Sequence, residues 1–231
     1  KYPNQIFMKA MILSAGYGKR LRPLTLKCPK PLLKIGDGGE TLLSNTLKFL
    51  KLFGIRQVII NVHYLREQIT DYIKKNSFDL NIKIIEEKDT ILDTGGGVLN
   101  AIHHFSNENF LIINPDTIWS PYYLDELKLM ETFFIKNESN QCSLLLVNKR
   151  KSFDRSLKGE FNLKNNLISR KNKDNLNYIY TGLQIINPEV FTNINDKVFS
   201  MNRIWDKLIE SNGLFGLESN IDFRHVSTLE I

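Results

Sequence analysis

The 231 residues include only two cysteines, Cys28 and Cys142, and these are far apart in the chain. Their spacing matches no metal-binding pattern, and so few cysteines are typical of a reducing compartment, which predicts a cytoplasmic protein. No apolar run reaches the roughly 20 residues of a membrane-spanning helix. The N-terminus also lacks the charged-then-apolar pattern of a secretory signal. We therefore expect no membrane partner.

The charge pattern also argues against a nucleic-acid partner. The net charge is +6, but lysine and arginine are scattered among acidic residues along the chain. Such a distribution is typical of a solvated surface. The composition, 42% hydrophobic and 24% charged, is ordinary for a globular protein. The length suits one α/β domain with a substantial core, so we expect a single domain over residues 1–231. Residues 1–7 precede Met8 as a tag remnant, an extension or the product of an upstream start.

Two common phosphate-binding motifs are missing. The chain has no G-x-x-x-x-G-K-[S/T] sequence, and the G-x-G at residues 16–18 lacks the third glycine of a dinucleotide-binding fingerprint. A different arrangement is present, because an apolar strand at residues 8–14 opens into small residues followed by cations. Small residues leave backbone N–H groups accessible to phosphate, and fixed cations bind it. The candidate nucleotide-binding residues here are Ala15, Gly16, Gly18, Lys19 and Arg20.

Taken alone, this loop has a second interpretation as a tight turn with solvated charges. Further along, Pro29 and Pro31 restrict the backbone on both sides of Lys30, which would hold its ammonium group still. A short strand is expected at residues 32–35, ended by the turn at residues 36–39.

The rest of the chain alternates strand and helix patterns, which predicts a mostly parallel sheet covered on both faces. A hairpin is expected within residues 149–173. The expected strands are residues 8–14, 57–62, 81–86, 110–113, 142–147 and 178–186, and the expected helices are residues 43–53, 65–73, 98–105, 124–135, 204–209 and a short one from Pro188.

Two further segments carry candidate ligand contacts. The glycine run, residues 95–97, predicts a loop where a base or sugar lies against bare backbone, which makes Gly95 and Gly96 nucleotide-binding candidates. Asp116 follows the strand at residues 110–113, and ligands of doubly wound sheets bind beyond the carboxyl ends of strands. An isolated aspartate in this position is also a common helix cap or turn residue.

The complete string Gly-x-Gly-x-Arg-x-Arg-Pro-Leu-Thr at residues 16–25, followed by Pro-Lys-Pro-Leu at residues 29–32, resembles the signature of the sugar-1-phosphate nucleotidylyltransferases. The resemblance extends in order from Met8 to Thr228. It implies a three-layer α/β, Rossmann-like fold with a mixed, mostly parallel sheet of the nucleotide-diphospho-sugar transferase type. Within the family, the chain looks most like N-acetylmuramate-1-phosphate uridylyltransferases and mannose-1-phosphate guanylyltransferases.

The family resemblance implies an activity and roles for three residues. An NTP and a sugar-1-phosphate would condense to an NDP-sugar and pyrophosphate, by in-line attack on the α-phosphate with Mg²⁺. The phosphate is already largely dianionic at neutral pH, so no general base is needed. By resemblance, Arg20 would bind the β- and γ-phosphates, Lys30 the α-phosphate or the sugar phosphate, and Asp116 the Mg²⁺.

The C-terminal part of the chain matches the family pattern at one segment and departs from it at another. Thr181 and Gly182 match the family's sugar-side strand, which makes them candidate sugar contacts. His225 stands where the family has its second Mg²⁺-binding aspartate, and Ser227 stands where the family has glycine. Imidazole binds Mg²⁺ less well than carboxylate does, so His225 would hold a metal-bound water or contact phosphate directly.

Alternatives stay open at this point. One is a cytidylyltransferase for a non-sugar phosphate such as phosphocholine, and another is a catalytically silent protein that binds nucleotide sugars. The base and the sugar are not specified by the residues. We expect a monomer or a small homo-oligomer.

Overall fold

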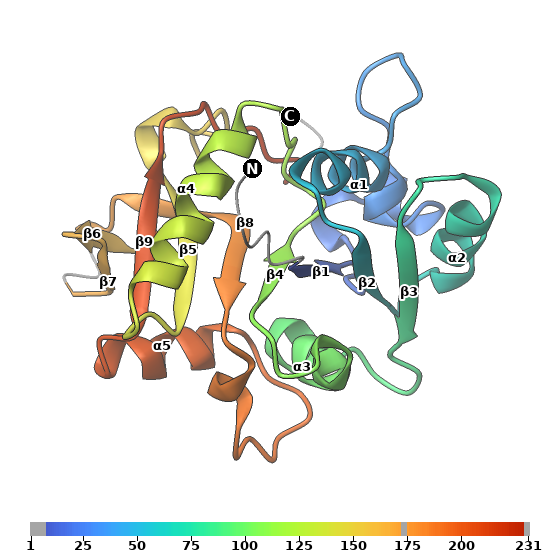
Figure 1. Cartoon of the computed structure of the whole chain (residues 1–231). Helices are drawn as coiled ribbons and strands as arrows, with labels where there is room; N and C mark the ends of the chain where they lie inside the picture. The colour runs from blue at the N-terminus through green and yellow to red at the C-terminus, as the bar shows by residue number, and fades with distance from the viewer. Residues whose placement is uncertain (1–7, 172–174, 229–231) are drawn as a thin grey trace, which may run out of the picture.

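The computed structural model describes residues 8–171 and 175–228, so residues 1–7 lie outside it. A nine-stranded sheet with the order β3-β2-β1-β4-β8-β5-β9-β7-β6 runs through the described part (Figure 1). The strands are β1 (Lys9–Leu13), β2 (Gln57–Val62), β3 (Asn81–Glu86), β4 (Phe110–Ile113), β5 (Cys142–Asn148), β6 (Asn162–Lys164), β7 (Leu167–Ser169), β8 (Tyr178–Ile186) and β9 (Leu214–Ser219). The helices are α1 (Leu42–Phe53), α2 (Arg66–Lys75), α3 (Asp93–Ala101), α4 (Tyr123–Lys136) and α5 (Asn202–Glu210).

The sheet is mixed and mostly parallel, as predicted. Strands β3, β2, β1 and β4 are parallel, and β5 is parallel to β9. Strand β8 runs antiparallel to both of its neighbours, β4 and β5. The central strands are buried on both faces, which explains why their sequences are continuous apolar runs instead of alternating ones.

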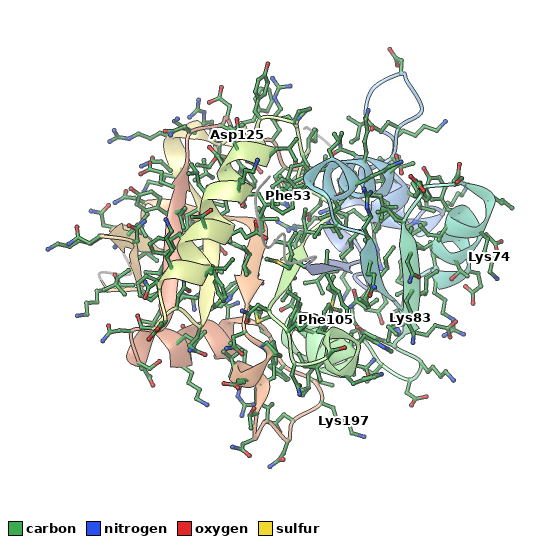
Figure 2. The ribbon with its side chains drawn as sticks, viewed as in Figure 1. Phe53, Lys74, Lys83, Phe105, Asp125 and Lys197 are labelled. Carbon is green, nitrogen blue, oxygen red and sulfur yellow. The ribbon has the colours of Figure 1, made fainter. Side chains whose placement is uncertain are left out.

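Two hydrophobic cores cover the two faces of the sheet and make three layers. One core packs α1, α2 and α4 against the sheet, and the other packs α3 and α5 against the opposite face. Figure 2 shows the charged side chains of Lys74, Lys83 and Lys197 on the outside, whereas Phe105 is buried in the second core. None of the helices within residues 8–171 and 175–228 has the length and hydropathy to cross a lipid bilayer.

Most expected elements are confirmed, but two are wrong. Residues 32–35 form no strand; a 3₁₀ turn at Lys30–Leu32 is followed by a single bridge between Lys34 and Thr41. The glycine run is not a loop but lies inside α3. Its first-turn N–H groups, from Gly95 and Gly96, both donate to the carbonyl of Phe199. Glycine permits this helix because its backbone packs directly on that of the 197–199 segment.

The strand directions place the functional loops together. Strands β1, β2, β4, β5 and β9 point the same way, because the antiparallel strand β8 separates β4 from β5. Their carboxyl ends therefore share one edge of the sheet, where ligands bind in folds of this kind.

Candidate active site

A cavity of about 370 Å³ lies at this edge of the sheet. Its walls come from residues 13–16 and 18–21 at the end of β1 and beyond it, from residues 114–116 after β4, and from the 3₁₀ turn that carries Lys30. The sequence prediction that Arg20, Lys30 and Asp116 meet in one cleft is confirmed, because all three residues line it. The remaining lining residues are Pro31, Asn61, Ile91, Asp93, Thr94 and Ser227.

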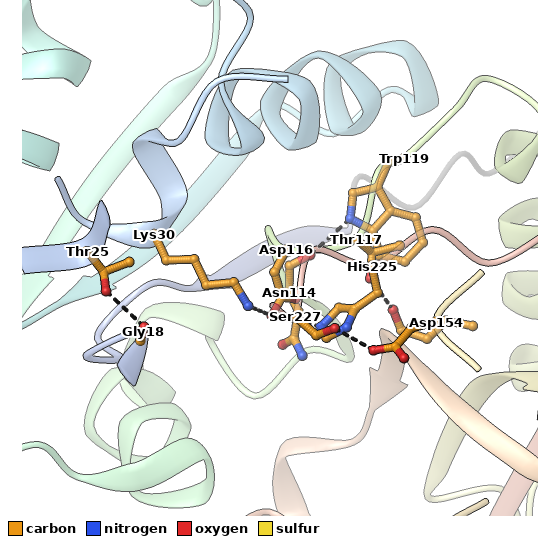
Figure 3. A network of polar contacts seen from close by, with 11 residues as sticks. Gly18, Thr25, Lys30, Asn114, Asp116, Thr117, Trp119, Asp154, His225 and Ser227 are labelled. Atoms are coloured by element: carbon orange, nitrogen blue, oxygen red, sulfur yellow. Dashed lines mark hydrogen bonds and ion pairs between the residues drawn. The ribbon is translucent and has the colours of Figure 1, made fainter. Parts of the chain in front are cut away.

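The glycine loop, residues 14–18, opens toward this cavity. Gly18 adopts a φ of 61°, in the left-handed region that favours glycine. Its carbonyl accepts a hydrogen bond of 2.9 Å from the Thr25 hydroxyl (Figure 3). Gly16 is exposed, and a Cβ built on it would meet no atom of the described residues within 4 Å. The loop is therefore anchored at Gly18 and open at Gly16, where a phosphate can approach the backbone.

The cations of the loop remain available for an anion. Lys19 and Arg20 are exposed and line the cavity. The Arg20 guanidinium makes no hydrogen bond or ion pair with residues 8–171 or 175–228. The Lys19 ammonium lies 5.4 Å from the centroid of the Tyr17 ring. Two positive charges at an open loop produce a positive potential that attracts phosphate.

Asp116 is the centre of the charged cluster (Figure 3). Its Oδ2 accepts from Lys30 Nζ at 2.5 Å and lies 3.0 Å from His225 Nε2. Burial opposes ionisation of this carboxyl group, but the neighbouring His225 and Lys30 outweigh burial and hold its pKa well below the usual range. The group is therefore a carboxylate at neutral pH.

His225 reaches Asp116 because the last described segment, residues 223–228, pairs with the residues after β4. Thr117 and His225 form an antiparallel bridge, and the Val226 N–H donates to the Asp116 carbonyl at 2.9 Å. The ring stacks on Phe223 with a centroid separation of 5.7 Å. The family resemblance suggested that His225 belongs to this site, and the backbone pairing supplies the structural reason.

A divalent cation fits this donor set in part. The Oδ1 atom of Asp116 is buried and has no hydrogen-bond partner among residues 8–171 and 175–228, which leaves a carboxylate oxygen for a hard cation. His225 is the neighbouring donor, and the described residues contain no cluster of three or more histidine, cysteine or acidic side chains that could hold a metal. Mg²⁺ commonly binds through one or two carboxylates, with water and substrate phosphates completing its shell. The residues present fit Mg²⁺ in that manner.

Five sequence candidates do not line the cavity: His225, which reaches the site through Asp116, and four others. The N–H groups of Gly95 and Gly96 are used by the Phe199 carbonyl. Thr181 is buried, and its hydroxyl donates to the Leu145 carbonyl at 2.8 Å. Gly182 has a φ of 96°, and the Asn114 side chain occupies the space beside it. The expected close approach at Gly182 is thus made by another part of the chain.

The sequence analysis missed the buried pair formed by Asn61 and Glu87. The Asn61 amide donates to Glu87 Oε1 at 2.7 Å and accepts from the Ser14 N–H at 2.9 Å. Glu87 Oε2 accepts from the Leu92 N–H at 2.8 Å. This pair ties the glycine loop to the start of α3, where Asp93 lines the cavity. A polar residue at the end of each of two neighbouring strands is the signal that could have revealed it.

Comparison with known proteins identifies the family of the chain. A model of the nucleotidyl transferase family matches residues 9–154, more than half of the chain. A probable mannose-1-phosphate guanylyltransferase 1 from Oryza sativa subsp. japonica is 28% identical over 218 residues, covering 91% of this chain and 58% of that protein. An N-acetylmuramate alpha-1-phosphate uridylyltransferase from Caulobacter vibrioides is 25% identical over 222 residues, covering 94% and 90%.

The fold agrees as well. A crystal structure of HddC from Yersinia pseudotuberculosis superposes with a TM-score of 0.74 at 21% identity, covering 96% of this chain and 95% of that one. The chain spans little more than half the length of the rice relative. The chain belongs to the nucleotidyl transferase family, and its resemblance to the sugar-1-phosphate nucleotidylyltransferases is confirmed.

Proposed function

We propose that this member of the nucleotidyl transferase family joins the nucleotidyl group of an NTP to a sugar-1-phosphate and releases pyrophosphate. The observation that carries the proposal is the convergence of Arg20, Lys30 and Asp116 around one cavity beside an open glycine loop. Two cations and accessible N–H groups suit a triphosphate, and the carboxylate suits its metal ion.

The chemistry requires the chain to hold two anions together. An oxygen of the sugar phosphate bonds to the α-phosphorus as the bond to the bridging oxygen of pyrophosphate breaks. The nucleophile needs no general base because its second pKa is near ~6. Arg20 stabilises the departing β- and γ-phosphates, and Lys30 orients the α-phosphate or the incoming phosphate. Positioning and electrostatic stabilisation then supply the rate enhancement.

Asp116 would hold the metal ion through its Oδ1 atom, to which no other described residue donates a hydrogen bond. Mg²⁺, when bound, supplies positive charge to the reacting phosphates. In this arrangement Lys30, which donates a hydrogen bond to Oδ2, keeps the carboxylate ionised and fixes its orientation. His225 does the same from the other side.

The first candidate substrate pair is UTP with N-acetylmuramate-1-phosphate. This choice is supported by the Caulobacter relative, because the alignment covers most of both chains. GTP with mannose-1-phosphate is the second candidate, supported by the rice relative, which is slightly more similar but much longer.

The test measures pyrophosphate release from UTP, GTP, CTP and dTTP, each with N-acetylmuramate-1-phosphate, mannose-1-phosphate and phosphocholine. Turnover with a sugar phosphate supports the proposal. Turnover with phosphocholine and CTP alone would replace the sugar acceptor with a non-sugar one. Binding of NDP-sugar without turnover on any pair would indicate a silent binding protein and refute the proposal.

The same assay tests the assigned residues. Arg20→Ala and Asp116→Asn should each lower kcat by about 10²–10³, the cost of removing one preorganised electrostatic contact. Arg22→Ala is the matched control, because Arg22 belongs to the same motif but does not line the cavity. It should stay within about twofold of wild type. Near-normal turnover in either site variant would remove that residue from the mechanism.

A further inference from the structure

We propose that Asp154 is a positioning residue for this site. Its carboxylate accepts a hydrogen bond from Ser227 and thereby holds the segment that carries His225 next to Asp116. We call the contact between Asp154 and Ser227 the latch. The inference rests on the proposed function, since it names a further part of the same site. Asp154 itself lies outside the cavity lining, so it acts through Ser227.

The latch is a short hydrogen bond between two buried side chains. The Ser227 hydroxyl donates to Asp154 Oδ2 at 2.7 Å, across 73 residues of sequence (Figure 3). Ser227 is 1% exposed and belongs to the cavity wall, two residues beyond His225. A hydrogen bond that accepts on a carboxylate is among the stronger ones in proteins.

Asp154 is itself held rigidly. Its Oδ1 atom accepts from the Ser156 hydroxyl at 2.6 Å and from the Ser156 N–H at 2.9 Å. The Ser152 hydroxyl donates to its carbonyl at 2.9 Å. The hydrogen bonds from Ser156 and Ser227 keep the pKa of Asp154 below its usual value. The carboxylate is therefore an ionised and immobile anchor.

The remaining tethers show what the latch adds. Phe223 exchanges backbone hydrogen bonds with Lys151 and Phe153, and Val226 donates to the Asp116 carbonyl. Backbone pairing thus holds the start and middle of the 223–228 segment. Beyond Val226 the described segment is tied by the Ser227 hydroxyl. The latch therefore holds the segment on the C-terminal side of His225.

The departures from the family pattern fit this role. The resemblance places a glycine at position 227, and glycine has no hydroxyl that could reach Asp154. This chain has serine there and an imidazole at position 225. An imidazole that contacts Asp116 must keep its ring plane as well as its position, so a second tether is useful. We infer that Ser227 and Asp154 act together with His225.

The experiment compares Ser227→Ala, Asp154→Ala and the double variant with Ser156→Ala. The Ser156 and Ser227 hydroxyls each donate a hydrogen bond to a different oxygen of the Asp154 carboxylate. Ser156→Ala is therefore the matched control. Three readouts are used: steady-state kinetics with the active substrate pair, amide hydrogen exchange of the 223–228 segment, and the thermal midpoint.

We expect Ser227→Ala and Asp154→Ala to lower kcat by about tenfold and to leave the KM for the NTP unchanged. This is the lower end of the losses seen when a residue that orients a metal ligand is removed. The kcat of the double variant should fall no further than that of Asp154→Ala alone, because both substitutions remove the same hydrogen bond. The Val226 amide should exchange faster in all three. Ser156→Ala should change kcat and exchange much less, because the Ser156 N–H still donates to Asp154 Oδ1 and the contact with Ser227 stays in place.

Three results would overturn the latch. The first is wild-type exchange at Val226 in Ser227→Ala. The second is an equal loss in Ser156→Ala, which would make the contact a general loop stabiliser. The third is a drop in the thermal midpoint with kcat unchanged, which would assign the contact a purely structural role. If wild type turns over no pair in the panel, the proposed function fails, and hydrogen exchange alone still decides whether the latch holds the segment.

Discussion

The glycine loop at residues 14–18 and the glycine run at residues 95–97 differ in what surrounds each missing side chain. A Cβ on Gly16 would stand in open space, whereas one on Gly96 would lie 2.1 Å from the Lys197 carbonyl oxygen. In the first segment glycine leaves room for a ligand, and in the second it lets a helix touch another backbone. The comparison teaches that glycine-rich sequence alone does not identify a ligand site.

Gly96→Ala should have the largest effect on stability. The helix would gain up to about 1 kcal/mol in propensity. The added methyl group overlaps a backbone oxygen that cannot turn away, and overpacking of this kind costs typically 1–3 kcal/mol and at times more. We expect the free energy of unfolding in urea to fall by about 2 kcal/mol. A stability equal to wild type would mean that the 197–199 segment moves easily to make room for the methyl group. The two glycine segments would then not differ in how tightly they are packed.

Gly18→Ala should have an intermediate effect, because Gly18 belongs to the open loop but has a packed side. An L-residue at φ 61° costs about 1 kcal/mol, and the new Cβ would lie 2.9 Å from the Thr25 methyl group. We expect a loss of about 1.5 kcal/mol in the same unfolding measurement. The double variant Gly18→Ala, Thr25→Ser keeps the hydroxyl and removes the methyl group, so it should recover part of the loss. No recovery would assign the whole cost to the backbone.

Gly16→Ala should have the smallest effect on stability, within about 0.5 kcal/mol of wild type, because nothing lies near the added methyl group. The same methyl group would stand where we expect phosphate to approach the backbone. We therefore predict a KM for the NTP about tenfold higher, equivalent to about 1.4 kcal/mol. An unchanged KM together with unchanged stability would show that the open side of the loop is not used.

The sequence predicted most of the framework. Continuous apolar runs marked the central strands, and the alternation of strands and helices placed the glycine loop and Asp116 at one edge of the sheet. Both inferences need only local pattern and the geometry of parallel strands. They were enough to place the glycine loop with Arg20 near Asp116, whereas the role of Lys30 beside them came from the family resemblance.

The missed features depend on partners distant in sequence. The Phe199 carbonyl that turns the glycine run into a helix lies about 100 residues away from it. The Thr181 hydroxyl points to Leu145 on the neighbouring strand, which the strand pattern alone does not reveal. The latch joins residues 73 positions apart. Local composition carries no information about such contacts.

The pairing of residues 223–228 with the segment after β4 also sets an order of events during translation. A nascent chain whose first 154 residues have left the ribosome already carries the glycine loop, Lys30 and Asp116. It still lacks His225 and Ser227, because these follow about 70 residues later. The surroundings of Asp116 therefore cannot be completed until residues 223–228 have been synthesised and have paired with the segment after β4.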